Sequence, residues 1–262
     1  MVEIISEPIE DRFYNLVIDS NKCIRLCSPF IKESIVKRIY KNKKSNVKID
    51  YISNFNLGNF YKKSSDIKAF EEPVKYKDKI YNCQMLHAKF YIFDDEYTIV
   101  TSSNLTPSGF KENLEYGVFI NDKVLVNQTV NDFKAICNSE ITGKIGIKEI
   151  IKIKRILNSF PSYKDINLYD KQKEIDGILH IDKELLEGNL SNWQNTVFKV
   201  INLIGKDEFS LSDIYNYKHI FKKVFPNNNT IRNSIRRTLQ ELRDLGLVKF
   251  YGNGRYKKLW NL

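Results

Sequence analysis

Short apolar runs and stretches with helical spacing alternate along the first part of the chain. Runs of apolar and β-branched residues predict buried strands, whereas apolar residues three and four positions apart predict helices with one buried face. Strands are predicted at 22–28, 46–53, 79–94, 96–103 and 113–120. Helices are predicted at 10–21, 29–41 and 124–137, the second with Ser28 and Pro29 as its cap and first turn. This order predicts an α/β fold with a mixed sheet.

Two other stretches have a weaker pattern. Residues 54–79 show no clear period and are rich in Lys, Ser and Asn, which predicts an irregular, mobile insertion. Residues 138–190 predict short helices interrupted at Pro161. Within them, residues 147–160 predict an amphipathic linker helix, with a dimer contact as the alternative interpretation.

The last part of the chain predicts a second compact unit. Helices are predicted at 193–205, 210–217 and 227–246, and Ser210 or Ser212 caps the second of them. Residues 247–260 predict a hairpin that turns at Gly252-Asn253-Gly254. Three helices and a hairpin predict a winged helix-turn-helix. We therefore expect an α/β domain at 1–145, a helical linker at 146–190 and a winged-helix domain at 191–262.

The net charge is distributed unevenly between these parts of the chain. The chain carries 42 Lys and Arg against 32 Asp and Glu, a net charge of +10, and residues 191–262 alone contribute +8, from 13 basic and 5 acidic residues. A basic module of this kind indicates a polyanionic partner, and duplex DNA is the first candidate. A charged but merely solvated surface is the alternative.

Composition excludes several other classes. The chain is 42% hydrophobic, as in ordinary globular proteins, and lacks the run of roughly 18–20 apolar residues that a membrane span requires. The acidic start, MVEIISEPIEDRF, does not have the pattern of a signal peptide, so we expect a cytoplasmic protein without a membrane partner. The four cysteines show no zinc-ligand spacing and are expected to be reduced thiols.

Five polar residues on the last three predicted strands of the α/β domain indicate phosphoryl chemistry. They are His87, Lys89, Ser102, Asn104 and Glu115. Lysine and amide side chains bind phosphate oxygens, and a histidine can attack phosphorus or transfer a proton near neutral pH. Glu115 is expected to hold the far ring nitrogen of His87. A single strand histidine is more often a packing or surface residue, and Asp94 is expected to form a turn or a structural hydrogen bond.

The order and spacing of these residues resemble the phospholipase D superfamily. His87, Lys89 and Asp94 match its H-x-K-x(4)-D motif. In the G-S-x-N and N-x-E motifs, Thr101 stands where the family usually has Gly, while Ser102, Asn104, Asn113 and Glu115 match. The resemblance covers about residues 20–140.

The resemblance implies a two-step mechanism without metal or other cofactor. One histidine attacks the phosphodiester to form a phosphohistidine, a second protonates the leaving oxygen, and water then reverses these roles. The family fold needs two motif copies, whereas this chain has one, because His180 and His219 lack the spacing. The resemblance therefore implies a homodimer with its active site at the subunit interface.

The basic module carries candidate DNA-binding residues. On the predicted helix 227–246, Ile231, Ile235, Leu239 and Leu242 form the core stripe. The candidates off this stripe are Asn228, Asn229, Thr230, Arg232, Asn233, Arg236 and Arg237, and the hairpin adds Lys249, Arg255 and Lys257. Arg and Asn recognise base edges, and Lys contacts phosphates. This module resembles the winged-helix domain that follows some restriction endonucleases, including methyl-directed ones.

Together these features predict a metal-independent, restriction-type DNA endonuclease. Two alternatives are a catalytically inactive dimeric DNA-binding regulator and a phosphodiesterase acting on a lipid or nucleotide. The complete set of five polar residues argues against a catalytically inactive regulator, and the lack of a membrane segment argues against a lipid substrate.

Overall fold

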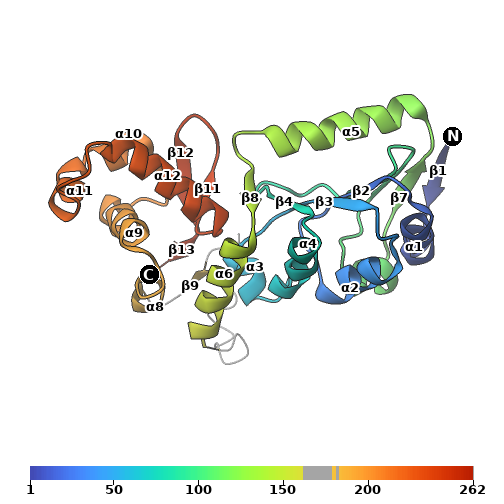
Figure 1. Ribbon diagram of the computed structural model, residues 1–262, viewed down its shortest axis with the longest axis horizontal. Helices are drawn as coiled ribbons and strands as arrows, with labels where there is room; N and C mark the ends of the chain where they lie inside the picture. The colour runs from blue at the N-terminus through green and yellow to red at the C-terminus, as the bar shows by residue number, and fades with distance from the viewer. Residues whose placement is uncertain (162–178, 181–182, 262) are drawn as a thin grey trace. The chain divides into compact units, whose positions relative to one another are not determined.

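A computed structural model describes residues 1–161, 179–180 and 183–261 (Figure 1). The chain divides into two compact units, which we describe separately. The first contains Met1–Phe55 and Lys62–Ile150, and the second contains Asn56–Tyr61 and Ile151–Leu262. The domain boundaries expected at 145 and 190 stay a prediction, and residues 162–178 of the predicted linker lie outside the described residues.

The first unit is built on an eight-stranded mixed sheet with the order β1-β7-β6-β5-β2-β3-β4-β8. Its strands are β1 (Val2–Ile5), β2 (Cys23–Cys27), β3 (Lys48–Ser53), β4 (Lys79–Asn82), β5 (Phe90–Phe93), β6 (Tyr97–Thr101), β7 (Gly117–Ile120) and β8 (Gly143–Ile145). Strands β2, β3 and β4 are parallel, and β5 lies antiparallel to β2 with Cys27 opposite Phe90. The predicted mixed α/β sheet is confirmed.

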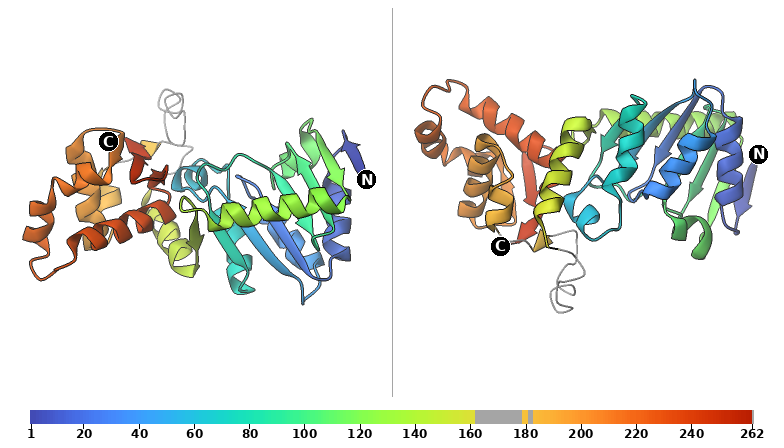
Figure 2. Two further views of the ribbon diagram at one scale, coloured as in Figure 1. Left: turned by 90° about the horizontal axis from the view of Figure 1, so that it is seen from above. Right: turned by 60° about the horizontal axis from the view of Figure 1, so that its bottom comes forward.

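Helices cover both faces of this sheet (Figures 1 and 2). They are α1 (Glu10–Asp19), α2 (Glu33–Asn42), α4 (Glu71–Lys75) and α5 (Lys123–Asn138), and α6 (Ile147–Ser159) begins at the end of this unit. Phe13 of α1 packs its ring edge-on against Tyr91 and Phe93. On the other face, Phe133 of α5 packs against Phe90. Because helices cover both faces, every residue of β5 is buried.

The predicted 79–94 strand is wrong as one element. The chain turns at residues 84–85, so β4 and β5 are separate strands, and the residues from 86 to 89 have no regular structure. Ala88 lies in this irregular stretch and is exposed. The edge strands β1 and β8 were not predicted.

The irregular insertion expected at 54–79 is wrong. This stretch forms α3 (Leu57–Tyr61), a 3₁₀ turn η1 (Ile67–Phe70) and α4, and most of its large apolar side chains are buried. In the first unit, Phe55 and Phe70 pack edge to face at 5.2 Å. These rings provide enough buried apolar surface to order the segment.

The predicted start of the second helix is also wrong. Helix α2 begins at Glu33, and its first turn is capped from a distance, because the carboxylate of Asp66 accepts the Glu33 N–H at 3.0 Å. Ser28 instead has its hydroxyl buried next to residues of the β6–β7 connection.

The second unit contains the predicted winged helix-turn-helix. Its elements are α8 (Lys183–Glu187), α9 (Asn192–Ile204), β10 (Glu208–Ser210), α10 (Leu211–Tyr215), α11 (Lys218–Val224), α12 (Ile231–Asp244), β11 (Val248–Phe250) and β12 (Arg255–Lys258), together with β9 (Leu179–His180) and β13 (Trp260–Asn261). Ser210 and Asp213 form a capping box at the start of α10, which confirms Ser210 as the cap. The hairpin turn is confirmed, with positive φ at Gly252, Asn253 and Gly254.

A single apolar core joins the helices of this unit. The predicted stripe of α12 is buried, with Ile235, Leu239 and Leu242 each 0% exposed. Helix α11 was not predicted, and its Phe221 completes the core under Trp193. Helix α12 begins at Ile231, so the expected start at 227 is wrong and Asn228, Asn229 and Thr230 lie in the turn before the helix. No described helix of the chain is long and apolar enough to cross a membrane.

Candidate active site and nucleic-acid interface

His87 and Lys89 lie on the extended segment that leads into β5. The His87 side chain is exposed, and the Lys89 side chain is partly buried with its Nζ donating to the carbonyl oxygen of His87 at 2.7 Å. The Thr101 N–H donates to the Lys89 carbonyl at 3.1 Å, which joins this segment to the end of β6. Backbone pairing therefore brings the histidine and the lysine beside the end of β6.

Ser102 and Glu115 meet beside the same end of β6. The Ser102 hydroxyl donates to the Glu115 carboxylate and accepts the Tyr116 N–H at 3.0 Å. Asn113 donates from Nδ2 to the other carboxylate oxygen at 3.1 Å. Ser102 N–H also donates to the Tyr116 carbonyl at 3.0 Å, so the two chain segments are held together on both sides of the serine.

Asn104 is held from below by a buried serine. The Ser28 hydroxyl, which is 0% exposed, donates to the Phe30 carbonyl at 2.9 Å, lies 3.4 Å from Asn104 Oδ1 and accepts the Leu105 N–H at 3.1 Å. Because this contact uses Asn104 Oδ1, the amide nitrogen of Asn104 remains as a possible donor to an anion. Gly109 packs against the Asn104 backbone so closely that a Cβ there would lie 2.7 Å from the Asn104 carbonyl oxygen.

The electrostatics of the site centre on Lys89. Burial lowers the pKa of Lys89, and the nearby carboxylate of Glu115 opposes this shift by raising it. The lysine is thus placed as a partly desolvated cation next to a carboxylate that stabilises its charge. Such a cation interacts more strongly with a phosphate than a fully solvated lysine does.

These contacts join three of the five predicted residues, Lys89, Ser102 and Glu115, while Asn104 follows Ser102 by two positions and His87 joins through the backbone of its own segment. The predicted hydrogen bond between Glu115 and His87 is wrong within one chain. Among the described residues, the carboxylate of Glu115 accepts from Ser102 and Asn113, and His87 donates no side-chain hydrogen bond to it. The reason is that Ser102 and Asn113 lie nearer on the adjoining β6–β7 connection.

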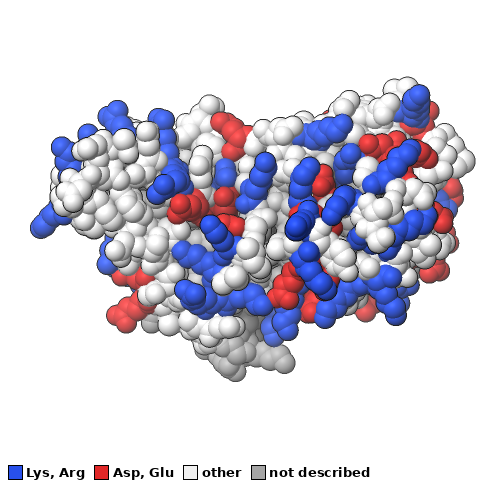
Figure 3. All heavy atoms as spheres, in the orientation of Figure 1, with Lys and Arg blue, Asp and Glu red and all other residues white. Residues whose placement is uncertain are grey.

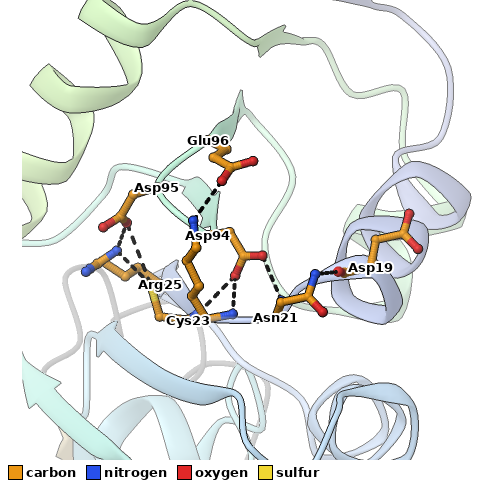
Figure 4. A network of polar contacts seen from close by, with 8 residues as sticks. Asp19, Asn21, Cys23, Arg25, Asp94, Asp95 and Glu96 are labelled. Carbon is orange, nitrogen blue, oxygen red and sulfur yellow. Dashed lines mark hydrogen bonds and ion pairs between the residues drawn. The ribbon is translucent and has the colours of Figure 1, made fainter.

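Asp94 lies at the other end of β5 from His87. It has positive φ (55°), and its carboxylate accepts the N–H groups of Asn21, Lys22 and Cys23 at 2.7, 2.7 and 3.0 Å (Figure 4). This geometry stabilises the turn between α1 and β2. The expected structural role of Asp94 is therefore supported by its hydrogen bonds.

Metal-binding residue types do not cluster in the described part of the chain. Among the described residues, no group of three or more His, Cys, Asp or Glu side chains is placed to hold a metal ion. The polar groups at the candidate active site are instead a lysine, an amide and a hydroxyl, which donate hydrogen bonds to phosphate oxygens.

A polar groove lies at the start of α12 in the second unit. It has a volume of about 580 Å³, and it is lined by Asn228, Asn229, Thr230, Arg232 and Asn233, which were predicted, and by Lys218 and Lys222, which were not. Asn228 organises the turn, since its side chain accepts the Thr230 N–H at 2.8 Å and donates to Ser234 at 3.0 Å. The remaining polar groups of the groove are available to a ligand at the N-terminal end of a recognition-type helix.

Tyr215 contacts two of the predicted arginines. Its hydroxyl accepts from Arg236 Nε at 3.0 Å, and the guanidinium of Arg232 lies over its ring at 5.1 Å. Arg237 instead forms an ion pair with Glu241 at 3.6 Å on the same helix. On the wing, Lys249 lies opposite Lys257 across the strand pair, and Arg255 is exposed.

Sequence reasoning missed the residues that support these two sites. They are Ser28, Asn113, Tyr215, Lys218 and Lys222. The N-x-E spacing of Asn113 and the basic character of Lys218 and Lys222 were available signals. The roles of Ser28 and Tyr215 depend on partners 76 and 21 residues away, so no local pattern could have shown them.

Known proteins resemble both units. Residues 16–137 match the family described as Cardiolipin synthase, PLD-like domain, and residues 189–258 match the Dam-replacing HTH domain. Among solved structures, Nuc, a phospholipase D family member from Salmonella typhimurium, is 19% identical, with 56% of this chain and 98% of that chain covered and a TM-score of 0.48. NucT from Helicobacter pylori is 16% identical, with 56% and 99% covered and a TM-score of 0.45.

Proposed function

A phospholipase D-like domain and a Dam-replacing helix-turn-helix domain make up most of this chain, and we propose that it is a restriction-type DNA endonuclease that hydrolyses phosphodiester bonds without a metal ion. The convergence of Lys89, Ser102, Asn104 and Glu115 on the edge beside His87 carries this proposal. The basic groove at the start of α12 supports DNA as the substrate.

In the proposed first step, a ring nitrogen of His87 attacks the scissile phosphorus. A phosphorus–nitrogen bond forms, the bond to the leaving oxygen breaks, and His87 of the partner subunit donates a proton to that oxygen. In the second step this now neutral histidine takes a proton from water, which attacks the phosphohistidine and releases His87. Two imidazoles in complementary protonation states can perform both steps near neutral pH.

The other residues hold the phosphate through these steps. The Lys89 ammonium and the amide of Asn104 donate to the non-bridging oxygens, where negative charge accumulates in the transition state. Glu115 raises the pKa of Lys89 against the effect of burial and accepts a hydrogen bond from the hydroxyl of Ser102. In this assignment Glu115 acts through Lys89 and Ser102 within its own subunit.

A homodimer is proposed because one chain supplies one such histidine. Apolar side chains close to the catalytic residues support this arrangement, since Met85, Val100, Leu114 and Tyr116 are 50%, 39%, 98% and 59% exposed. Exposed apolar residues gathered around an exposed histidine are typical of a surface that another chain covers. A second copy on this surface would bring the two His87 side chains to one site.

The test is cleavage of methylated and unmethylated plasmid DNA with excess EDTA, followed by sequencing of the ends. We expect cleavage without added metal, and loss of cleavage but retention of DNA binding in His87→Ala. Activity that requires magnesium would contradict the metal-independent mechanism. A gel shift without nicking, at high protein concentration and long incubation, would instead indicate an inactive regulator.

Subunit mixing tests the shared site. If each site needs His87 from both subunits, then an equal mixture of refolded wild-type and His87→Ala chains retains about a quarter of the activity, because only dimers of two wild-type chains are active. Retention of half of the activity would show that each subunit works independently.

A further inference from the structure

A cluster of lysines lies at one end of the sheet's strands, and the catalytic residues lie at the other end. Lys48, Lys77 and Lys79 line a hollow of about 290 Å³ at the beginning of strands β3 and β4, and Lys43 and Lys75 flank it. We call these five residues the lysine patch. The active site lies beyond the other end of β2, which is about 13 Å long, so the patch lies more than about 13 Å from the active site.

Aromatic and backbone groups hold these ammonium groups together. The rings of Tyr40 and Tyr76 stack at 4.8 Å, with Lys43 Nζ 5.5 and 5.3 Å from their centroids. Lys75 Nζ lies 5.5 Å from the Tyr76 ring, and Lys48 donates to the Tyr76 carbonyl at 2.7 Å. Ring faces and carbonyl oxygens attract cations without cancelling their net charge, so the patch stays positive.

Acidic groups pair with two of the five patch lysines: Lys48 Nζ lies 3.8 Å from Asp78, and Lys75 Nζ lies 3.6 Å from Glu72. The Asp78 side chain is 0% exposed and accepts from the Tyr40 hydroxyl at 2.5 Å and the Ile49 N–H at 3.3 Å. Asp50 lies inside the hollow, where burial raises its pKa. Lys77 and Lys79 are exposed and form no ion pair within the described part of the chain.

We propose that the lysine patch binds the phosphate backbone of the DNA duplex at a distance from the bond that is cut. A separation of more than about 13 Å corresponds to at least about four base-pair steps. Figure 3 shows Lys and Arg side chains gathered over α2 and α4, which border the patch. Tyr76 is the one large apolar residue exposed here, so the patch lacks the apolar insertion surface that favours a membrane. The inference rests on the proposed function, because it takes the bound polyanion to be the DNA substrate.

The test compares the salt dependence of DNA binding by full-length variants. The double variant K77Q/K79Q removes two patch charges without breaking an ion pair, and K123Q/K134Q removes two exposed charges from α5 as a matched control. The logarithmic slope of affinity against salt should fall by about 2 in K77Q/K79Q, equally for different DNA sequences, and remain unchanged in the control.

An unchanged slope in K77Q/K79Q, or an equal change in the control, would overturn the inference. Binding to vesicles of anionic phospholipid that depends on Lys77 and Lys79, with an unchanged DNA slope, would overturn it in favour of a lipid surface. Wild-type cleavage is measured in parallel. If the wild type neither binds nor cuts DNA, the proposed function fails, whereas normal wild-type cleavage with an unchanged variant slope contradicts the patch inference alone.

Discussion

Ser102 and Glu115 are joined by a hydrogen bond from the serine hydroxyl to the carboxylate, and the same carboxylate raises the pKa of Lys89 against the effect of burial. One acidic side chain therefore acts on two groups that face the proposed phosphate position. The N–H of Tyr116 completes the contact by donating to the Ser102 hydroxyl at 3.0 Å. This arrangement gives Glu115 a positioning role that a pH profile can detect.

We expect Glu115→Gln to shift the alkaline limb of the kcat/KM profile to lower pH. The amide removes the negative charge that opposes the lowered pKa of Lys89, so the lysine loses its proton earlier as the pH rises. The lowered pKa of Lys89 has the opposite effect on stability: the protonated lysine destabilises the fold below its folded-state pKa, and stability rises as the pH increases from that pKa to the higher pKa of the unfolded chain. Glu112→Gln, an exposed carboxylate three positions away, is the control. An alkaline limb that stays in place in Glu115→Gln would contradict the coupling.

Ser28→Ala should reduce kcat by about three- to tenfold, which corresponds to one neutral hydrogen bond in the transition state. The buried hydroxyl contacts Asn104 Oδ1 and accepts the Leu105 N–H, so its loss frees the amide to rotate. Stability should also fall by about 1–3 kcal/mol, because the Leu105 N–H is left without this acceptor. Ser65→Ala is the matched control, since its buried hydroxyl accepts the Ile31 N–H at 3.1 Å and does not contact Asn104. Equal kcat losses in both variants would indicate a general folding effect.

Gly109→Ala should lower activity by about a hundredfold. A Cβ at this position would lie 2.7 and 2.8 Å from the backbone oxygen and nitrogen of Asn104, so the loop must move to make room. A displacement of about 1 Å of a phosphate-binding group is sufficient for such a loss. Gly188→Ala, whose nearest neighbour would be the Glu184 carbonyl at 3.4 Å, is the control. Steady-state cleavage rates, measured together with thermal unfolding, would show whether activity falls more than stability; unchanged cleavage would refute the tight contact.

Asp94→Ala should destabilise the protein by about 2–3 kcal/mol while leaving cleavage by the folded enzyme unchanged. The carboxylate accepts three N–H groups at the start of β2, and alanine is also strained at positive φ (Figure 4). Asp94→Asn keeps one acceptor oxygen and tolerates this backbone conformation, so its loss should be smaller. Chemical denaturation provides the stability measurement. A loss of cleavage in fully folded Asp94→Ala would assign Asp94 a direct role in chemistry.

The central strands and the long helices could be predicted because their apolar period is set by burial on the sheet or against a helix. The core stripe of α12 and the glycine turn of the wing are of this kind. The short edge strands β1 and β8 carry no comparable pattern, because each is defined by pairing with a distant neighbour, β7 and β4 respectively. The break between β4 and β5 contains neither Gly nor Pro, so local residues did not signal it.

The candidate site, like the fold, could be predicted only in part. Motif spacing identified Lys89, Ser102 and Asn104 because these residues follow the ends of adjacent strands. The partner of Glu115 was predicted wrongly, since parity on a strand does not apply to the irregular residues on either side of β7. Ser28 could not be found, because its contact with Asn104 arises only when the sheet brings β2 beside the β6–β7 connection.

Tyr215→Phe should weaken DNA binding by about two- to tenfold. Its hydroxyl accepts from Arg236 Nε, so the phenylalanine ring keeps the contact with Arg232 but leaves Arg236 free to adopt other rotamers, which must then be ordered on binding. Tyr215→Ala removes both contacts and should weaken binding further. Tyr217→Phe is the control, because among the described residues the Tyr217 hydroxyl forms no hydrogen bond. The measurement is the affinity of each variant for the cognate duplex and for an unrelated duplex at one salt concentration. If Tyr215→Phe binds both duplexes as the wild type does, then Arg236 is not positioned for DNA by this tyrosine.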